Sequence, residues 1–144
     1  MAEFAFETEW TGGKGAIDRS QQLSAAVAAA AKVLAASVAD GAGGAETPGA
    51  VLEHLDSLRD ANRDLVQAFE NMAGQLARMR QHNILISVKE EGAQTQRSAD
   101  AVLALSAAAD GARQLDGLIS AAREPLLDLA LTTEAGSAVW DLYQ

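Results

Sequence analysis

Two histidines, His54 and His82, are the residues of this chain best suited by type to binding a metal ion. They fall on one predicted helix, about 42 Å apart at about 1.5 Å per residue, so one ion cannot contact both within a single helix. Ferritin-like metal bundles use Glu-x-x-His pairs on two helices, and neither histidine follows a glutamate at that spacing. The sequence therefore predicts no metal site within one chain. Two antiparallel copies would bring His54 of one beside His82 of the other, so a metal across an oligomer interface stays an alternative.

Three aspartates, Asp56, Asp60 and Asp64, recur every four residues and would share one helix face. Arg59 and Arg63 lie beside them and would relieve their repulsion. We interpret this stripe as a solvated acidic face. The alternative is a docking face for a basic partner or a weak cation site.

Motifs of enzymes are missing from the sequence. There is no cysteine, which excludes thiol catalysis, thiolate metal ligands and disulfide bonds. No serine stands in a Gly-x-Ser-x-Gly motif, and the sequence has neither a phosphate-binding loop nor a dinucleotide fingerprint. The glycine-rich segment 11–15 lacks the required spacing and is interpreted as a hinge. We therefore predict that the protein is not an enzyme and uses no cofactor.

The formal net charge of −9 argues against two classes of partner. Nucleic acid and anionic membrane surfaces both need a basic footprint on the protein. The local maximum of positive charge is Arg78 and Arg80, with Lys89 and Arg97 farther along, which is too thin for such a surface. We expect no nucleic-acid partner and no membrane partner.

Residues 23–39, LSAAVAAAAKVLAASVA, imitate a targeting signal or a membrane span. The region before them is acidic rather than basic, Lys32 interrupts the apolar run, and alanine is a weak membrane residue. We predict a soluble helix here. With the absence of cysteine, which fits a reducing compartment, this favours a cytoplasmic protein.

Alanine richness with only two prolines points to an all-α protein. We predict one helical domain over residues 1–144. Its parts are an N-terminal arm (1–15), a first helix (17–39), a glycine-rich loop (40–47), a second helix (48–90), a third helix (93–131) and a C-terminal arm (132–144). Thr47 and Pro48 suit the cap and the first position of the second helix. The aromatic residues of the arms are expected to pack on the helices.

The second predicted helix carries a heptad pattern, the strongest periodic signal in the chain. With Leu55 as position a, apolar or asparagine side chains occupy a and d without a skip. The a positions are Leu55, Asn62, Phe69, Leu76 and Asn83, and the d positions are Leu58, Leu65, Met72, Met79 and Ile86. Asn62 and Asn83 would either meet their own copies in a parallel pair of helices or take backbone or water partners in a monomeric bundle.

The third predicted helix carries a similar but smaller seam of apolar residues: Leu105, Ala108, Ala112, Leu115, Ile119, Ala122, Leu126 and Leu129. Large residues on one helix facing small residues on the other are typical of interdigitating neighbours. We therefore predict a long antiparallel, coiled-coil-like hairpin of the second and third helices, with the first helix packed on it. Whether the chain turns at Gly92 or runs on is left open by the pattern.

A core rich in alanine buries little apolar area, so we expect a further chain to complete it. The heptad seam is the candidate interaction surface. The sequence thus favours a non-enzymatic assembly or protein-interaction module, either a homo-oligomer or a small subunit of a larger complex.

The tripeptide Trp10-Thr11-Gly12, in a small, acidic, cysteine-free helical chain, resembles the WXG-type helical-hairpin proteins exported by type VII secretion. The resemblance implies an exported protein that folds with a partner, which is the alternative function. In that family the tripeptide lies at the turn between two helices, whereas here it precedes the first. The family's Tyr-x-x-x-Asp/Glu tail is missing, since one residue follows Tyr143.

Overall fold

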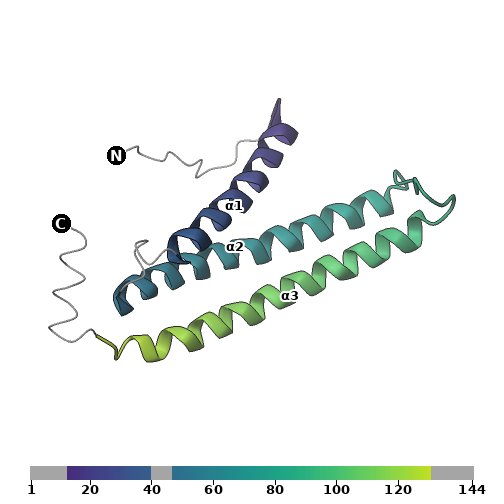
Figure 1. Ribbon diagram of the computed structural model, residues 1–144. Helices are drawn as coiled ribbons and strands as arrows, with labels where there is room; N and C mark the ends of the chain where they lie inside the picture. The colour runs from purple at the N-terminus through teal and green to yellow at the C-terminus, as the bar shows by residue number, and fades with distance from the viewer. Residues whose placement is uncertain (1–12, 40–46, 131–144) are drawn as a thin grey trace. The chain divides into compact units, whose positions relative to one another are not determined.

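The computed structural model describes residues 13–39 and 47–130, and within them it contains three helices and no strand. They are α1 (Ala16–Ala39), α2 (Pro48–Gln81) and α3 (Gln94–Leu126) (Figure 1). The all-α prediction is confirmed. The chain divides into two compact units, Met1–Gly44 and Ala45–Gln144, and each is described by itself. The aromatic residues of both predicted arms, the Trp-x-Gly tripeptide and loop residues 40–46 lie outside the described residues.

Helix α1, in the first unit, begins after two glycines with positive φ, Gly13 and Gly15. These glycines allow the turn in which the Ala16 amide donates to the Gly13 carbonyl at 3.1 Å. The 24 residues of α1 are rich in alanine, and none of them is buried. By length and composition α1 is long and apolar enough to cross a membrane. That it is a soluble helix remains a prediction from its flanking charges and Lys32.

Helix α2 begins as the sequence predicts. Thr47 has extended backbone, and its hydroxyl accepts a hydrogen bond from the Ala50 amide at 3.0 Å. Pro48 takes the first helical position, where its missing N–H costs nothing. The predicted cap of this helix is therefore confirmed.

Helix α2 ends at Gln81, so the prediction that it continues to residue 90 was wrong. Asn83 adopts a left-handed conformation, with φ of 55°. The Asn83 amide donates to the Arg80 carbonyl at 3.1 Å, and the Ile84 amide donates to the Met79 carbonyl at 3.3 Å. These two bonds form a Schellman motif, which satisfies the last carbonyls and stops the helix. Asparagine is the residue after glycine that best tolerates this conformation.

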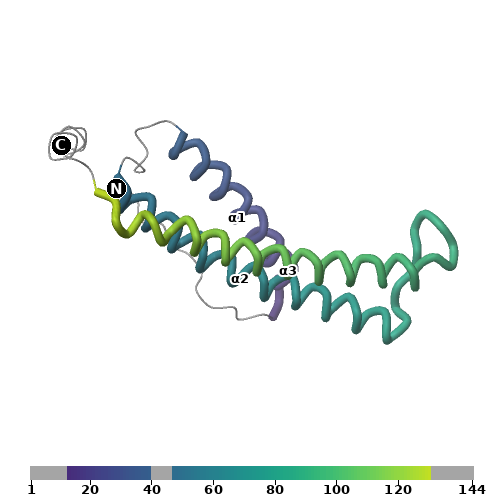
Figure 2. Tube along the Cα trace, turned by 90° about the horizontal axis from the view of Figure 1, so that it is seen from below, coloured from purple at the N-terminus to yellow at the C-terminus, as the bar shows by residue number. Residues whose placement is uncertain are grey.

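Helices α2 and α3 run antiparallel and side by side, joined at one end by residues 82–93 (Figures 1 and 2). We call this unit the α2/α3 hairpin. Gly92, with φ of 82°, lies just before α3, so the chain turns here and does not run on as one rod. Helix α3 ends at Leu126 rather than at residue 131, one residue after Pro125, whose ring cannot donate a helical hydrogen bond.

The buried residues of the α2/α3 hairpin are small: Ala73, Ala109, Ala112, Ser98 and Asn62. Small side chains let two helices approach closely, but each buries little apolar area. None of the described side chains that are large and apolar is fully buried. The thin core expected from the sequence is therefore present within this unit.

Candidate interaction surface

The heptad seam of α2 is divided by the structure into two rows with different surroundings. The inner row consists of the a positions Leu55, Asn62, Phe69 and Leu76, which are buried or half-buried. Asn62 belongs to the contact with α3, because its side chain bonds to that helix. Ala73, at position e, is buried too. The residues that contact α3 therefore occupy positions a and e rather than a and d. This is the spacing of an apolar stripe of period 3.6 on an ordinary α-helix.

The outer row consists of the d positions Leu58, Leu65, Met72 and Met79. Their exposed fractions run from 39% at Leu65 to 50% at Met72. Scattered apolar residues on a surface are ordinary, but four large ones repeated every seven residues on one helix form a continuous strip. The outer row is therefore the exposed part of the predicted seam within α2.

The remaining two seam residues, Asn83 and Ile86, do not belong to the surface. Both follow the end of α2, and Ile86 lies in non-helical backbone with 83% of its surface exposed. Their assignment to the heptad was wrong, because the Schellman motif ends the helix before the repeat would reach them. Asn83 has the role of a helix stop.

Asn62 takes a backbone partner within its own chain. Only 5% of its surface is exposed, and Nδ2 donates to the Ala112 carbonyl oxygen of α3 at 2.7 Å. A carbonyl oxygen has two lone pairs, so Ala112 can accept this bond beside its helical one. Of the alternatives left open by the sequence, this is the one expected for a bundle within one chain.

One edge of the α2/α3 contact is lined by three ion pairs that sequence reasoning missed. Arg63 Nε lies 3.0 Å from Asp116 Oδ1, and Arg123 Nε lies 2.5 Å from Asp56 Oδ1. The third pair, Glu70 with Arg113, lies nearer to the connecting segment than the other two pairs. The α2 members, 56, 63 and 70, are spaced by seven residues and each follows an inner-row residue. The sequence shows this spacing on α2. The α3 residues that pair with it could be identified only from the register between the two helices. We call this the ion-pair edge.

The hydrogen bond from Arg123 lowers the pKa of Asp56, and its positive charge and that of Arg59 act in the same direction against partial desolvation. The same contact raises the pKa of Arg123. The lowered pKa keeps the Asp56 carboxylate ionised to a lower pH than an unpaired aspartate. Asp56 belongs to the ion-pair edge and is not available as part of an acidic docking stripe.

The other residues suggested by their chemistry do not converge. Asp60 and Asp64 are exposed on α2. His82 is the residue that follows α2, whereas His54 lies in its second turn. Within residues 13–39 and 47–130, no three histidine or acidic side chains lie close enough together to bind a metal ion.

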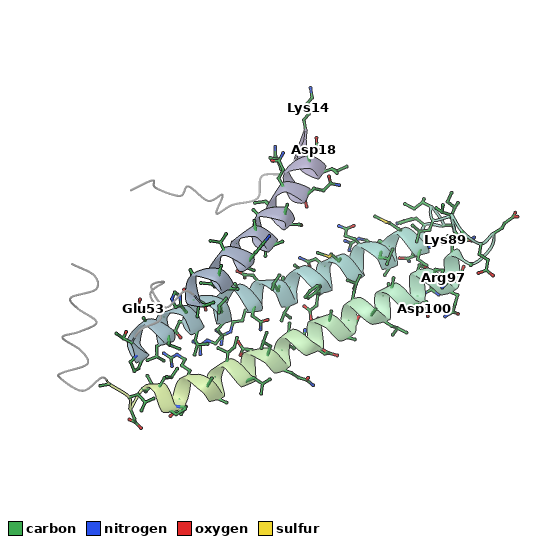
Figure 3. All side chains as sticks on the ribbon, viewed as in Figure 1. Lys14, Asp18, Glu53, Lys89, Arg97 and Asp100 are labelled. Carbon is green, nitrogen blue, oxygen red and sulfur yellow. The ribbon has the colours of Figure 1, made fainter. Side chains whose placement is uncertain are left out.

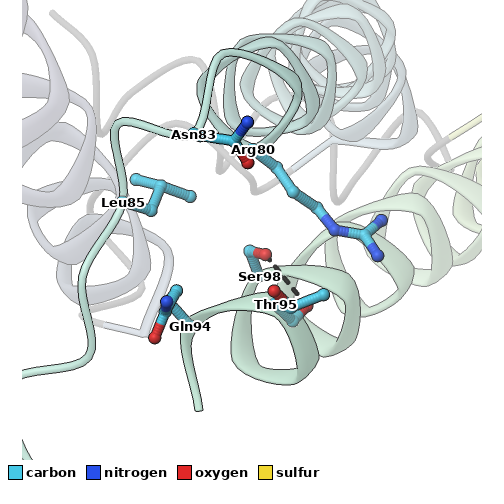
Figure 4. Close-up of a pocket in the computed structure, with 6 residues that line it drawn as sticks. All are labelled: Arg80, Asn83, Leu85, Gln94, Thr95 and Ser98. Atoms are coloured by element: carbon cyan, nitrogen blue, oxygen red, sulfur yellow. Dashed lines mark hydrogen bonds between the residues drawn. The ribbon is translucent and has the colours of Figure 1, made fainter. Parts of the chain in front are cut away.

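A polar cavity of about 70 Å3 lies at the end of the hairpin near the connecting segment (Figure 4). It is lined by Arg80, Asn83, Leu85, Gln94, Thr95 and Ser98. Ser98 already donates to the Thr95 carbonyl at 3.1 Å. The cavity is large enough for one or two waters and too small for a cofactor.

The edge opposite the ion pairs is mainly apolar. Successive residues of an α-helix are rotated by about 100° about the helix axis. The residues directly before and after a contact residue therefore lie on opposite sides of it. Arg63 and Arg113 follow the contact residues Asn62 and Ala112 and reach the ion-pair edge, so Ala61 and Gly111 lie on the other edge. The residues that share this side at helical spacing form what we call the open edge. On α2 they are the outer row with Ala61 and Ala68 and the polar His54 and Gln75; on α3 they are Ala104, Ala107, Gly111, Leu115, Leu118 and Ala122.

Comparisons with known proteins do not identify a function for this surface. No family model, curated protein or solved structure matches the chain. The conclusions on function therefore depend on the geometry of the α2/α3 hairpin.

Proposed function

We propose that this chain is a non-enzymatic assembly and protein-interaction module, which acts as a homo-oligomer or as a small subunit of a larger complex. The observation that carries the proposal is the outer row: Leu58, Leu65, Met72 and Met79 are exposed at seven-residue intervals along α2. Covering such a strip with another helix would remove apolar surface from water, which is the main driving force of association between helices in solution.

The thin core of the hairpin supports the same proposal. The inner row is matched by small α3 residues, so the two helices alone bury little apolar area. A module of this kind gains stability when it assembles, because a partner that binds only the folded state shifts the folding equilibrium toward it.

The proposal is tested by adding charge to the outer row. The double variant Leu65→Glu/Met72→Glu places two carboxylates on it. The matched control Gln67→Glu/Asn71→Glu adds the same charges to exposed positions of the same helix turns. We expect the first to abolish association and the control to keep it. Association is measured as self-association by light scattering and as binding of proteins from the native cell to the immobilised chain. If wild type and both variants associate equally, or none associates with anything, the proposal is wrong.

A further inference from the structure

The two edges of the α2/α3 hairpin differ in a way that indicates what covers one of them. The ion-pair edge carries charged side chains that pair with one another across the two helices and remain partly exposed, with a cavity of about 210 Å3 among Arg63, Val66, Arg113 and Asp116. The open edge has no ion pairs between the helices, and its larger residues, among them Leu65 and Leu118, are exposed apolar side chains. Of the two edges, the open edge is therefore the one on which an additional apolar helical layer would remove more apolar surface from water.

We propose that a second copy of this chain covers the open edge, with α2 of each copy lying antiparallel over α3 of the other. The two hairpins would form a four-helix arrangement around a twofold axis parallel to the helices. This inference rests on the proposed function and specifies its partner.

Charge is the first reason for choosing a second copy. Two chains with a net charge of −9 repel each other wherever their charged surfaces meet. No aspartate, glutamate, lysine or arginine belongs to the open edge, so this is a face on which identical copies can meet. The nearest charged residues on this side of α3 are Arg97 and Asp100, which lie at the end of the helix near the connecting segment (Figure 3).

Shape is the second reason, because the open edge is complementary to itself. Its α2 half carries large residues such as Leu58 and Met72, and its α3 half carries small ones such as Ala107, Gly111 and Ala122. Placing α2 of one copy over α3 of the other brings Met72 level with Ala107 and Ala61 level with Leu118, so that large residues meet small ones at these levels. At the centre two small residues, Ala68 and Gly111, meet, and Leu65 comes level with Leu115. Placing α2 over α2 would crowd one contact and leave the other empty.

The level of each residue follows from the ion pairs. Asp56 lies opposite Arg123 and Arg63 lies opposite Asp116, and by this register Ala68 lies level with Gly111. The pair of Glu70 with Arg113 departs from this register by four residues, so the level holds to within about one helical turn. Rotation about an axis parallel to the helices keeps these levels, so Ala68 of one copy would face Gly111 of the other.

The available area is sufficient for a dimer. From Leu58 to Met79 the open edge runs about 30 Å, and two helices span about 20 Å, which gives on the order of 600 Å2 per copy. The sum over two copies, about 1,200 Å2, is at the lower limit of stable interfaces between proteins.

Two glycines of α3 provide a matched pair of variants. A Cβ added at Gly111 or at Gly117 meets nothing within 4 Å, so both positions accept a side chain within the hairpin. Gly111 lies on the open edge, whereas Gly117, which follows Asp116, lies on the side of the ion pairs. We expect wild type and Gly117→Glu to have twice the chain mass of 14.9 kDa by light scattering. Gly111→Glu should dissociate at least roughly 100-fold more readily, because it buries an unpaired carboxylate.

The arrangement itself is tested by disulfide formation, since the chain has no cysteine of its own. Single variants Ala68→Cys and Gly111→Cys are mixed and oxidised. A crosslinked heterodimer that neither variant forms alone supports α2 lying over α3. A crosslinked Ala68→Cys homodimer would overturn this arrangement and place α2 against α2.

The other outcomes separate this inference from the proposed function. A wild-type monomer refutes the second copy. If that monomer binds another protein through the outer row, the proposed function stands with a different partner. A monomer whose melting temperature falls in Gly111→Glu but not in Gly117→Glu would identify α1 of the same chain as the cover. A dimer that Gly111→Glu leaves intact would refute the open edge as its interface.

Discussion

Replacing Asn62 by alanine tests whether the buried amide holds the α2/α3 hairpin together. Asn62 is almost fully buried and donates a 2.7 Å hydrogen bond to the Ala112 carbonyl of the facing helix. Losing such a bond costs about 1 kcal/mol, and the empty volume left by the amide adds to that cost. Alanine returns about 0.5 kcal/mol because it is the better helix former. We therefore expect Asn62→Ala to lower the free energy of unfolding by about 1 kcal/mol.

Asn71→Ala is the matched control on the same helix. Asn71 is exposed, and its Oδ1 accepts a bond from Gln67 within the helix at 3.0 Å. That contact contributes about 0.2–0.5 kcal/mol, which the gain in helix propensity offsets. The assay is urea unfolding followed by circular dichroism at one fixed protein concentration. At a slope of about 1.5 kcal/mol/M, Asn62→Ala should lower the midpoint by about 0.7 M relative to Asn71→Ala. Equal midpoints would refute a stabilising role for the buried amide.

Three further outcomes follow from described contacts. Because Arg123 lowers the pKa of Asp56, the ionised carboxylate stabilises the fold above its ordinary pKa near 3.8, and this contribution is lost as pH falls through the lowered value. Melting temperatures taken between about pH 5 and pH 2 should thus decline less in Asp56→Asn than in wild type, and parallel curves would contradict the pairing. Thr47→Ala removes the cap of α2 and should cost about 1 kcal/mol in urea unfolding, whereas Thr47→Ser should restore most of it. Asn83→Gly should keep or raise the melting temperature, whereas Asn83→Val should lower it because a β-branched residue resists positive φ; equal effects would show that the turn does not depend on this conformation.

The sequence predicted the helices of this fold better than their ends and contacts. Alanine content and the pair Thr47-Pro48 identify the class and the start of α2, because propensity and capping act locally. The end of α2 was missed because Asn83 continues the heptad pattern, whereas its backbone preference for the left-handed region decided the outcome.

The surface was predicted in part. The heptad identified Leu65 and Met72 of the outer row, but it could not separate them from inner-row residues such as Phe69, which face α3. That separation depends on the register between two helices distant in sequence. The ion pair of Glu70 with Arg113 also follows from the register alone, so no local pattern reveals it. Function, partner and localisation remain predictions, and the experiments above address the first two.

The segment that joins α2 to α3 determines more than the direction of the chain. Because α2 stops at its Schellman motif, residues 84–88 (ILISV) are left in non-helical backbone, with Ile86 and Val88 almost fully exposed. Short uncharged runs of β-branched residues without proline are the kind that stack into cross-β fibrils. Lys89, Glu90 and Glu91 follow at once, and charges in this position oppose such stacking. Opposition to stacking of this segment thus depends on three charged side chains of a loop and not on the helices.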